Sequence, residues 1–571
     1  MESNTNRPFT EPIGKILLLL LFFSFTHTYA QSDSVFLVKF IDKGAAQVTD
    51  NPGKLSAKAL ARREKYDIPI NELDLPVYGQ YISATLAIPG VRLRYSLKWH
   101  NGIVINANVK SIMELQKLAF VSSISYVGLT PPVETIETPL HTTLQLKLKE
   151  SEMNTTDLSV EDYGMSYGQN RQIGVTNLHK LGYNGNGVTV AVFDAGFKNI
   201  NTIPAFLRHQ ANGRLTLGYD AADLDNEFTG SDSHGTAVSS CTGAYDKGKY
   251  IGSAPLAHYI LYRSEQGATE TPLEELNWCK AAELADSVGV DMITSSLGYN
   301  QYDDQTLSYR HSQLDGNTSF ISLGARIAVE KGILVLNSAG NSGDNKWRKI
   351  GTPADVAHVL TVGAVDINDK YGRFSSQGNT SNGTTKPDIS ALGVLAHVGS
   401  PSGGYYQGYG TSYATPIAAG GVACLLQAFP NLAPSDINHL IRMTATRASL
   451  PDSFVGYGVA RFDLAYELQR HIDSSPDIPK IIKVDDNQII LYTADLNSIE
   501  ISLSKRRKFL GIFNINKNIM KDDITATSTV CIIPLGDYSI KCSQKHTIKI
   551  KLTSDVDTYE LKNNELYPCL H

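Results

Sequence analysis

Four polar residues stand where the sequence could support acyl-transfer chemistry. Asp194 follows VAVF, His234 opens HGTAV, Asn341 closes LNSAGN, and Ser412 lies in GTSYATP. A serine hydroxyl becomes an effective nucleophile when a neutral imidazole accepts its proton and a carboxylate fixes the imidazole tautomer. A side-chain amide such as Asn341, with the backbone N–H of Ser412, would stabilise the tetrahedral oxyanion. Together these residue types predict cleavage of an amide through an acyl-enzyme.

Each of the four residues also has a structural explanation when it is considered alone. Ser412 precedes an alanine-rich run and would serve as a helix N-cap, and Asp194 would serve as a turn or cap residue. A lone histidine such as His234 is more often a structural residue, and Asn341 with the next two residues reads as a plain turn. The chemical interpretation therefore rests on the combination.

The segments around these residues predict the elements that would position them. Between residues 163 and 470, nearly continuous apolar runs alternate with helical segments. The runs are VTVAVFDAG (188–196), HYILYRS (258–264), VDMITSSLG (290–298), GILVLNSAG (332–340) and VLTVGAV (359–365). Strands that are apolar on both faces predict an α/β fold with a parallel sheet and helices on both faces. Active sites in such sheets lie at the carboxyl ends of the strands, where Asp194 and Asn341 occur.

The motifs VAVFDAG, SHGTAV, SSLG, LNSAGN and GTSYATP, in that order, resemble those of the subtilisin-like serine proteases. The order Asp, His, Ser along the chain is also that of the subtilisin triad. This resemblance covers about residues 163–470 and implies a seven-stranded parallel core. It implies that Asp194, His234 and Ser412 form the catalytic triad and that Asn341 is the oxyanion donor.

The resemblance also implies a substrate-binding region beside the triad. An extended peptide would pair with the enzyme backbone, and the residues that would wall the S1 pocket are Ser296, Leu297, Gly298, Ser338, Ala339 and Gly340. The alternative explanation is that these two segments only end their strands and bind no substrate. No carboxylate directly follows Asn341, so a broad or apolar P1 preference is the default expectation.

Three positions depart from the usual pattern of the family that the chain resembles. Ala195 stands where serine or threonine is usual, Ala237 where histidine is usual, and Tyr413 where methionine is usual. The two alanines remove none of the groups that the reaction needs. Tyr413 is bulkier than methionine and has a polar tip that needs a partner or solvent. We expect it to affect local packing and substrate preference but not the chemistry.

The chain begins with features of a secretory signal peptide over residues 1–30. Residues 15–25, KILLLLLFFSF, form an apolar run that follows Arg7 and precedes small residues at 28–30. A membrane anchor is the competing interpretation, but the run is shorter than the ~20 apolar residues that span a bilayer. The expected location is secreted or cell-surface, with no stable membrane span after the signal is removed.

Residues 31–150 predict a small α+β unit and a connection. The unit would hold strands at 34–41 and 91–99, helices at 56–67 and 109–121, and antiparallel pairing with the helices on one face. It resembles the propeptide that chaperones and inhibits secreted subtilases, which would make it an intramolecular inhibitor. The polar, proline-broken stretch 130–160 is expected to be an exposed and cleavable connection.

The C-terminal residues change in character after an expected linker at 470–480. Residues 481–571 contain short strand-like runs, including FLGIFNI, and predict a small all-β domain of β-sandwich type, a candidate sorting or binding module. Six cysteines in 571 residues do not make a disulfide scaffold. Cys241 and Cys424 are expected to be buried thiols, whereas Cys531, Cys542 and Cys569 would allow one bridge and leave one thiol over.

The charge of the chain and its acidic residues indicate which classes of partner and cofactor to expect. The net charge of −6 gives no footprint for nucleic acid or an anionic membrane, so protein or peptide substrates are the expected partners. The acidic stretch at 220–232 does not match a regular calcium loop, and a solvated acidic loop is the expectation. No cofactor or metal site is assigned, although structural calcium is common in the family that the chain resembles.

The sequence as a whole predicts a secreted serine endopeptidase made as a zymogen. One alternative is a catalytically silent binding protein that keeps the fold, and the presence of all four site residues argues against it. Another alternative is an esterase or acyltransferase that uses the same triad, because the acyl-enzyme is common to these reactions.

Overall fold

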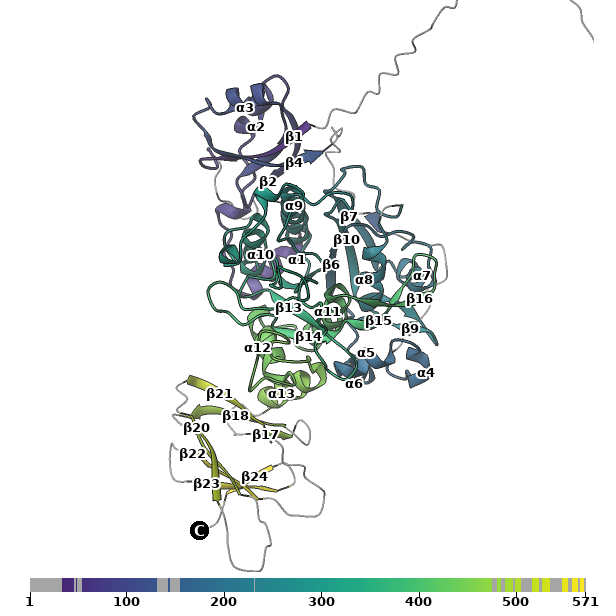
Figure 1. Ribbon diagram of the computed structural model, residues 1–571. Coiled ribbons are helices and arrows are strands. Elements are labelled where there is room, and N and C mark those ends of the chain that lie inside the picture. The colour runs from purple at the N-terminus through teal and green to yellow at the C-terminus, as the bar shows by residue number, and fades with distance from the viewer. Residues whose placement is uncertain are drawn as a thin grey trace, which may run out of the picture.

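The computed structural model describes residues 33–45, 48, 54–130, 142–143, 155–230 and 232–474, together with strands between 480 and 568. Figure 1 shows the N-terminal unit, a larger central unit and the C-terminal strands in succession. The expected signal peptide, most of the 130–160 connection and the run FLGIFNI lie outside the described residues. In the described part of the chain, no helix is both long and apolar enough to cross a membrane.

The N-terminal unit is built on a four-stranded antiparallel sheet. Its strand order is β2-β3-β1-β4, with bounds Arg92–Leu97, Gly102–Asn106, Asp33–Phe40 and Val121–Thr130. The helices α2 (Gly79–Leu86) and α3 (Val109–Leu115) contribute to a core that includes Phe40, Ile103 and Leu115. This confirms the small α+β unit.

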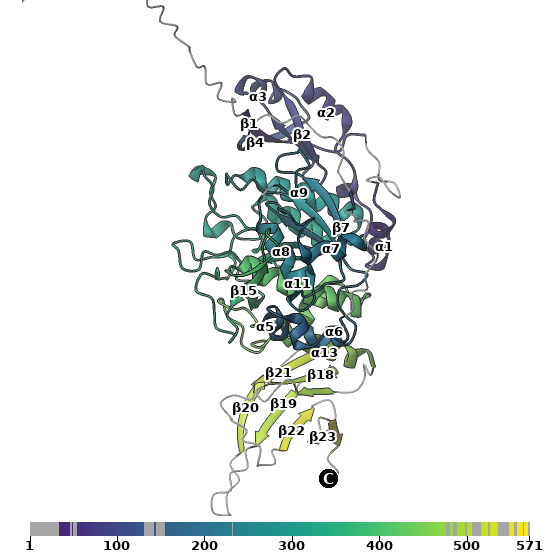
Figure 2. The ribbon, with the colours of Figure 1, turned by 90° about the vertical axis from the view of Figure 1, so that its right-hand side faces the viewer.

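Helix α1 (Ala57–Lys65) corrects one expectation for this unit. Ser56 caps it as the sequence predicts, because the Ser56 hydroxyl oxygen accepts the Ala59 N–H at 3.1 Å. However, the helix does not lie on the face of the N-terminal sheet. Figure 2 shows α1 apart from α2 and α3 and alongside the central unit. The expectation that all helices of the unit cover one face was therefore wrong, because the charged side chains of α1 bind groups of the central unit.

The central unit contains one large sheet with the strand order β14-β13-β12-β11-β6-β10-β7-β5. Seven strands run parallel, and they are β6 (Thr189–Asp194), β7 (Leu215–Asp220), β10 (His258–Arg263), β11 (Met292–Ser295), β12 (Leu334–Ser338), β13 (Leu360–Val365) and β14 (Ile389–Leu392). The short β5 (Thr142–Thr143) pairs antiparallel with β7. The seven-stranded parallel core is confirmed, and β5 shows that part of the 130–160 connection adds to the sheet edge.

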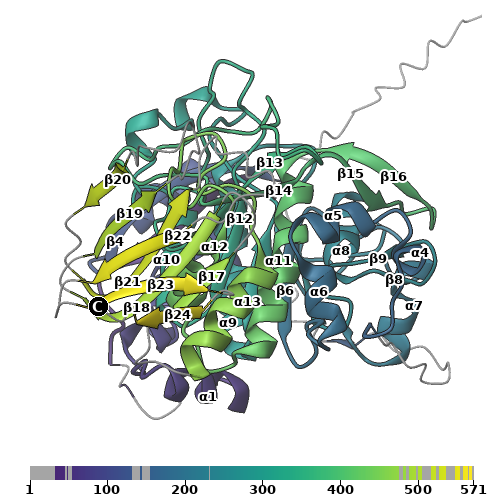
Figure 3. The same ribbon diagram turned by 90° about the horizontal axis from the view of Figure 1, so that it is seen from below.

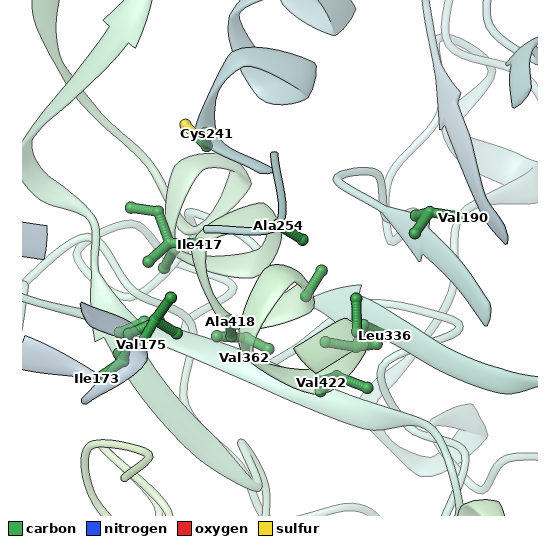
Figure 4. Close-up of a cluster of buried hydrophobic side chains, with 14 of the residues drawn as sticks. Ile173, Val175, Val190, Cys241, Ala254, Leu336, Val362, Ile417, Ala418 and Val422 are labelled. Carbon is green, nitrogen blue, oxygen red and sulfur yellow. The ribbon is translucent and has the colours of Figure 1, made fainter. Parts of the chain in front are cut away.

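Helices cover both faces of this sheet, and the side chains of β6 alternate between them. Val190 and Val192 pack in a core with α8 (His234–Gly243) and α11 (Thr411–Ala428), as Figure 4 shows in part. Ala191 and Phe193 pack on the opposite face with α9 (Pro272–Val288) and α10 (Phe320–Glu330). A strand that buries both faces must be apolar at successive positions, which explains the continuous apolar runs.

Helix α11 carries Ser412 in its first turn and is buried on nearly all sides. Ile417, Ala418 and Val422 pack among side chains of the sheet in Figure 4. Glycines allow close approach on its other sides, since a Cβ at Gly420 would lie 2.0 Å from the Ser253 Oγ. This packing fixes the position of the helix start.

The remaining elements complete the central unit and the C-terminal part. Helices α12 (Pro434–Thr444) and α13 (Phe462–Ser474) follow α11, and the hairpin β15 (Val394–Gly399) and β16 (Tyr405–Tyr409) leads into it. The shorter elements are α4 (Val160–Tyr163), α5 (Tyr167–Gln172), α6 (Val175–Lys180), α7 (Pro204–Ala211), β8 (Tyr245–Asp246), β9 (Tyr250–Ile251), and the 3₁₀ turns Glu72–Asp74, Gln305–Leu307 and His311–Gln313.

The C-terminal strands form two small sheets, seen from below in Figure 3. One contains β17 (Lys480–Lys483), β18 (Gln488–Leu496) and β21 (Ala526–Pro534); the other contains β19 (Ile499–Ser504), β20 (Asn516–Asp522), β22 (Thr547–Leu552), β23 (Asp557–Lys562) and β24 (Glu565–Pro568). The all-β character is confirmed. The expected linker at 470–480 was too long at its start, because α13 continues to Ser474.

Candidate functional site

Asp194 and His234 form the best-defined pair of the candidate site. Asp194 is the last residue of β6 and is fully buried, whereas His234 is the first residue of α8 and its side chain is 33% exposed. The His234 Nδ1 lies 2.9 Å from Asp194 Oδ1 and 3.1 Å from Oδ2. The Ala195 N–H also donates to Asp194 Oδ1 at 2.8 Å. The carboxylate thus holds Nδ1, which leaves Nε2 as the ring nitrogen that can accept a proton.

The surroundings of His234 favour its cationic form. Burial lowers the pKa of His234, but the Asp194 charge and hydrogen bond outweigh burial, and the pKa rises to about 9. The charges of Glu265 and Asp232 raise this pKa further. A neutral imidazole, which is the form that accepts a proton, is therefore favoured in alkaline solution.

Ser412 lies at the start of α11 and is 9% exposed. Its hydroxyl donates to the Ser296 carbonyl at 3.3 Å, and the Ser296 hydroxyl donates to the Ser412 carbonyl at 2.8 Å. Within the described residues, no hydrogen bond joins Ser412 to His234. The next residue, Tyr413, places its ring centroid 6.2 Å from that of His234. The start of α11 therefore lies near the imidazole, and the Ser412 hydroxyl is bonded to Ser296.

Asn341 is fixed against the residue that precedes Ser412. Its Oδ1 accepts the Thr411 N–H at 2.9 Å and the Thr411 hydroxyl at 3.0 Å. The Gly340 N–H donates to the same threonine hydroxyl oxygen at 3.2 Å. Because the amide oxygen faces Thr411, the NH₂ group of Asn341 is turned away from it and can serve as a donor.

The residues expected to wall the S1 pocket follow two neighbouring parallel strands, β11 and β12. Ser296, Leu297 and Gly298 follow β11, whereas Ala339 and Gly340 follow β12. The Leu297 carbonyl accepts Asn337 Nδ2 at 2.8 Å, which ties the two segments together. The structure thus places these residues beside one another and, through Ser296, against Ser412.

Two residues near the site were not singled out from the sequence. Thr411 orients Asn341, and it lies inside the quoted GTSYATP motif. Glu265 comes two residues after β10 and accepts a hydrogen bond from the Tyr299 hydroxyl. Burial raises the pKa of Glu265 to about 8, and the charges of Glu270 and Asp194 act in the same direction. The rule that selects polar residues after apolar strands would have identified Glu265.

The acidic stretch at 220–232 departs from the predicted solvated loop at its first residue, whereas Asp225, Glu227 and Asp232 are exposed as expected. Asp220 is fully buried and its Oδ2 accepts from Arg263 Nη1 at 3.1 Å. Burial raises the pKa of Asp220 to about 7. The first carboxylate of the stretch therefore binds an arginine of the same unit. Across the described ranges, no group of three histidine, cysteine, aspartate or glutamate side chains could hold a metal ion.

The cysteines of the central unit are buried free thiols. Cys241 and Cys424, as expected, lie in the core, and Cys279 is also buried. The side chains of Cys531, Cys542 and Cys569 lie outside the described residues, so the expectation for a bridge among them stays a prediction.

Comparison with known proteins identifies two matching family models. The "Subtilase family" model matches residues 185–458, and the "Peptidase S8 propeptide domain, Bacteroidota" model matches residues 35–140. These two matches cover the central unit around Asp194, His234, Asn341 and Ser412, and most of the N-terminal unit.

Curated relatives agree with these matches. Serine protease AprX of Bacillus subtilis is 32% identical over 287 residues, which are 45% of this chain and 61% of the relative. Subtilisin DY of Bacillus licheniformis is 29% identical over 291 residues, which are 50% of this chain and 92% of the relative. Alkaline serine exoprotease A of Vibrio alginolyticus is 26% identical over 293 residues, with 48% of the relative covered. The chain thus covers less than two thirds of AprX and of the Vibrio protein. Residues 185–458 are thus a domain of the subtilase family, and they are preceded by a domain of the S8 propeptide type.

Proposed function

We propose that this protein is a secreted serine endopeptidase made as a zymogen, with Asp194, His234 and Ser412 as the catalytic triad. The observation that carries the proposal is the contact of 2.9 Å between His234 Nδ1 and Asp194 Oδ1, beside a serine at the start of a buried helix. Protein or peptide substrates follow from the family, and no cofactor is needed for this chemistry.

The first half of the reaction forms the acyl-enzyme. The Ser412 hydroxyl leaves the Ser296 carbonyl, donates to His234 Nε2 and attacks the scissile carbonyl carbon. The proton passes to Nε2, and the imidazolium is stabilised by Asp194. When the tetrahedral intermediate collapses, the imidazolium returns this proton to the leaving amine.

The developing oxyanion needs donors that are already in place. The Ser412 N–H lies in the first turn of α11, an 18-residue helix whose N-terminal end carries partial positive charge. The NH₂ group of Asn341 is the second donor, since its Oδ1 is held by Thr411. The Ser412 N–H belongs to a buried helix, and the exposed Asn341 side chain is oriented by its two hydrogen bonds from Thr411, so little reorganisation is needed as charge develops.

The second half of the reaction releases the acyl group. Water takes the place of the amine and attacks the acyl carbon while His234 accepts its proton. The new tetrahedral intermediate then expels the Ser412 oxygen, which takes this proton back from the imidazolium. Peptide binding beside Ser296–Gly298 and Ala339–Gly340 would use backbone pairing, with a broad or apolar side chain at P1.

The N-terminal unit supports the zymogen part of the proposal, because a propeptide-domain model matches residues 35–140. We infer that the connection within 130–160 is cut by the enzyme itself and that the cut precedes full activity. Secretion rests on the apolar run at 15–25 and the small residues that follow it.

The test compares the native chain with Ser412→Ala, both expressed with the signal peptide in a host lacking other proteases able to cut them. The native chain should yield a form that begins within about residues 140–165, as read by mass spectrometry. The alanine variant should accumulate as a precursor, because covalent catalysis is lost while the fold is spared. Trimming of both chains at the same bond would refute self-processing.

A second arm separates peptidase activity from the alternatives. Casein and p-nitrophenyl ester hydrolysis are measured with and without a serine-directed phosphonate. Phosphonate-sensitive casein hydrolysis supports the endopeptidase. Ester hydrolysis alone would indicate an esterase, and absence of both would indicate a silent binding protein.

A further inference from the structure

The segment from Ser56 to Asp74 belongs to the N-terminal unit but does not pack on its sheet. It binds the central unit, mainly at the ends of α9 and α10. We call residues 56–74 the docking segment. It contains α1 and the 3₁₀ turn Glu72–Asp74, and α1 contacts α9. Figure 2 shows α1 beside the central unit, apart from the rest of the N-terminal unit.

Two consecutive arginines of the docking segment bind one buried carboxylate. Arg62 Nη2 lies 2.6 Å from Asp286 Oδ1, and Arg63 Nη2 lies 2.9 Å from the same oxygen and 3.0 Å from Oδ2. The three side chains are 5%, 3% and 0% exposed. Lys98, also in the N-terminal unit, lies 3.6 Å from Asp286 Oδ2. Among the described residues, the cations that form ion pairs with Asp286 therefore come from the N-terminal unit.

The same arginines bind the C-terminal ends of two helices of the central unit. Arg62 donates to the carbonyls of Asp286 at 3.2 Å and Val290 at the end of α9, and to that of Lys331 at the end of α10 at 3.1 Å. Arg63 also donates to the Lys331 carbonyl. Helix C-termini carry unpaired carbonyls and partial negative charge, which cations stabilise.

The central unit contributes the cation Lys331 directly after α10, but the Lys331 Nζ binds Asp74 of the docking segment at 2.7 Å. Neither α9 nor α10 has a basic residue in its last turn. Asp286 adds a negative charge to the last turn of α9, where the helix dipole disfavours it. The arginines of the docking segment therefore stabilise a buried carboxylate at a helix C-terminus.

Further contacts extend this surface on both sides. Ser56 donates its N–H to the Ser287 carbonyl and its hydroxyl to the Val288 carbonyl, each at 2.8 Å. Asp74 Oδ2 accepts from Lys331 Nζ at 2.7 Å, and the Tyr66 hydroxyl donates to the Leu432 carbonyl at 3.1 Å. The surface is thus built from several elements of the central unit.

We propose that the docking segment is a second binding element between the N-terminal unit and the central unit, with the contact of Arg62 and Arg63 to Asp286 as its main anchor. This inference rests on the proposed zymogen function. The partner that this surface fits is a helix with two adjacent arginines at its C-terminal end.

The experiment measures retention without using the enzyme's own activity. The full chain with Ser412→Ala receives the recognition site of an exogenous site-specific protease between residues 131 and 140. After cutting, the dissociation rate of the N-terminal fragment is measured from the central unit, which is immobilised through its C-terminus. Near-ultraviolet circular dichroism before cutting checks that each variant is folded.

The informative variants lie on both sides of the contact. Asp286→Asn and the double variant Arg62→Gln/Arg63→Gln should each raise the dissociation rate at least about 30-fold, because each leaves buried charged groups without full partners. The variant combining all three changes should exceed the stronger of the two only slightly, because they remove the same contact. If Asp286→Asn does not fold, the arginine variant carries the test alone.

Lys58→Gln is the matched control from the same helix. Lys58 pairs with Asp291 at 2.6 Å, but the two side chains are 43% and 28% exposed, so the rate should change by less than about 3-fold. The proposal is overturned if loss of the buried contact changes the rate no more than this control, or if the effects of the two anchor variants simply multiply. Because an exogenous protease makes the cut, a failure of self-processing or peptidase activity would not alter this result.

Discussion

The Asn341 side-chain oxygen is held by the Thr411 N–H at 2.9 Å, so the orientation of its amide is set by the residue that precedes the nucleophile candidate. This relationship links the oxyanion donor to the start of α11. A displacement of the helix start would move Ser412 and the Asn341 amide together, which keeps the two proposed oxyanion donors in register.

Asn341→Ala should lower kcat far more than it raises KM, since the oxyanion exists only after attack. The expected loss is about 10²- to 10³-fold in kcat, the size measured for the corresponding donor in subtilisin. Steady-state kinetics with a peptide substrate provides the measurement. Ser342→Ala, at the next position, is the control and should retain activity. Unchanged kcat with weakened substrate binding would contradict the assignment.

Tyr413→Met should leave the enzyme active, because the triad and the oxyanion donors are untouched. The Tyr413 ring lies near the His234 ring, with centroids 6.2 Å apart, so a change in substrate preference is expected. Kinetics with a set of peptides differing on either side of the scissile bond would measure it. Tyr409→Phe, at a tyrosine that is 61% exposed, is the control. Complete loss of activity in a folded Tyr413→Met protein would show that the tyrosine has a catalytic role.

The pH dependence of kcat/KM should reflect His234. Its pKa in the free protein is raised to about 9, so the fraction of neutral imidazole grows as pH rises through that value. We expect kcat/KM to increase from neutral to alkaline pH. For stability the sign is opposite, because the His234 contribution is complete below its unfolded pKa of about 6.5 and is lost through about 9. A flat kcat/KM profile between pH 7 and 10 would be inconsistent with this assignment.

Glu265→Gln should move the acidic limb of that profile to lower pH. The carboxylate of Glu265 raises the pKa of His234, and glutamine keeps the shape without the charge. A lower His234 pKa gives more neutral imidazole at a given pH. Glu330→Gln, at an exposed residue paired with Arg326, provides a control in which the limb stays in place. Movement of the limb to higher pH would show that Glu265 acts on His234 in another way.

Gly420→Ala should destabilise the central unit by about 1–3 kcal/mol, the usual cost of overpacking a tight core. The new Cβ would lie 2.0 Å from Ser253 Oγ and 2.6 Å from the Ser253 carbonyl carbon, and the second of these is backbone. Thermal unfolding of the Ser412→Ala background avoids self-digestion. Gly404→Ala meets nothing within 4 Å and should leave the midpoint unchanged. Equal midpoints for the two variants would mean that α11 can shift to make room.

The sequence predicted the strands that are apolar on both faces and missed those that are not. β6, β10, β11, β12 and β13 all belong to long apolar runs. β7 was missed because Thr216 and Gly218 interrupt its apolar pattern, and β14 because Ile389–Leu392 is only four residues long. In both cases the neighbouring strands determine the pairing, and this information is not local to the segment.

The candidate site was predictable as a set of residues but not as a geometry. Position at the end of a strand selected Asp194 and Asn341, whereas the hydrogen bond from Ser412 to Ser296 depends on the approach of α11 to the segment after β11. The position of α1 was beyond local patterns for the same reason. Arg62 and Arg63 look like ordinary surface charges until α9 and α10 bring Asp286 and the Lys331 carbonyl to them.

The N-terminal unit contacts helix α9 at both of its ends. Its 17 residues span about 25 Å, and Thr271 at its start lies against Gly128 of β4, while the docking segment binds its end. The distance between the two points at which the N-terminal unit is attached, Gly128 and the docking segment, must therefore match the length of α9. Insertions in the loop between β1 and α1 leave this distance unchanged. Adding or removing one turn of α9 would displace one of the two attachments. The length of α9 and the separation between the docking segment and β4 are therefore expected to change only together.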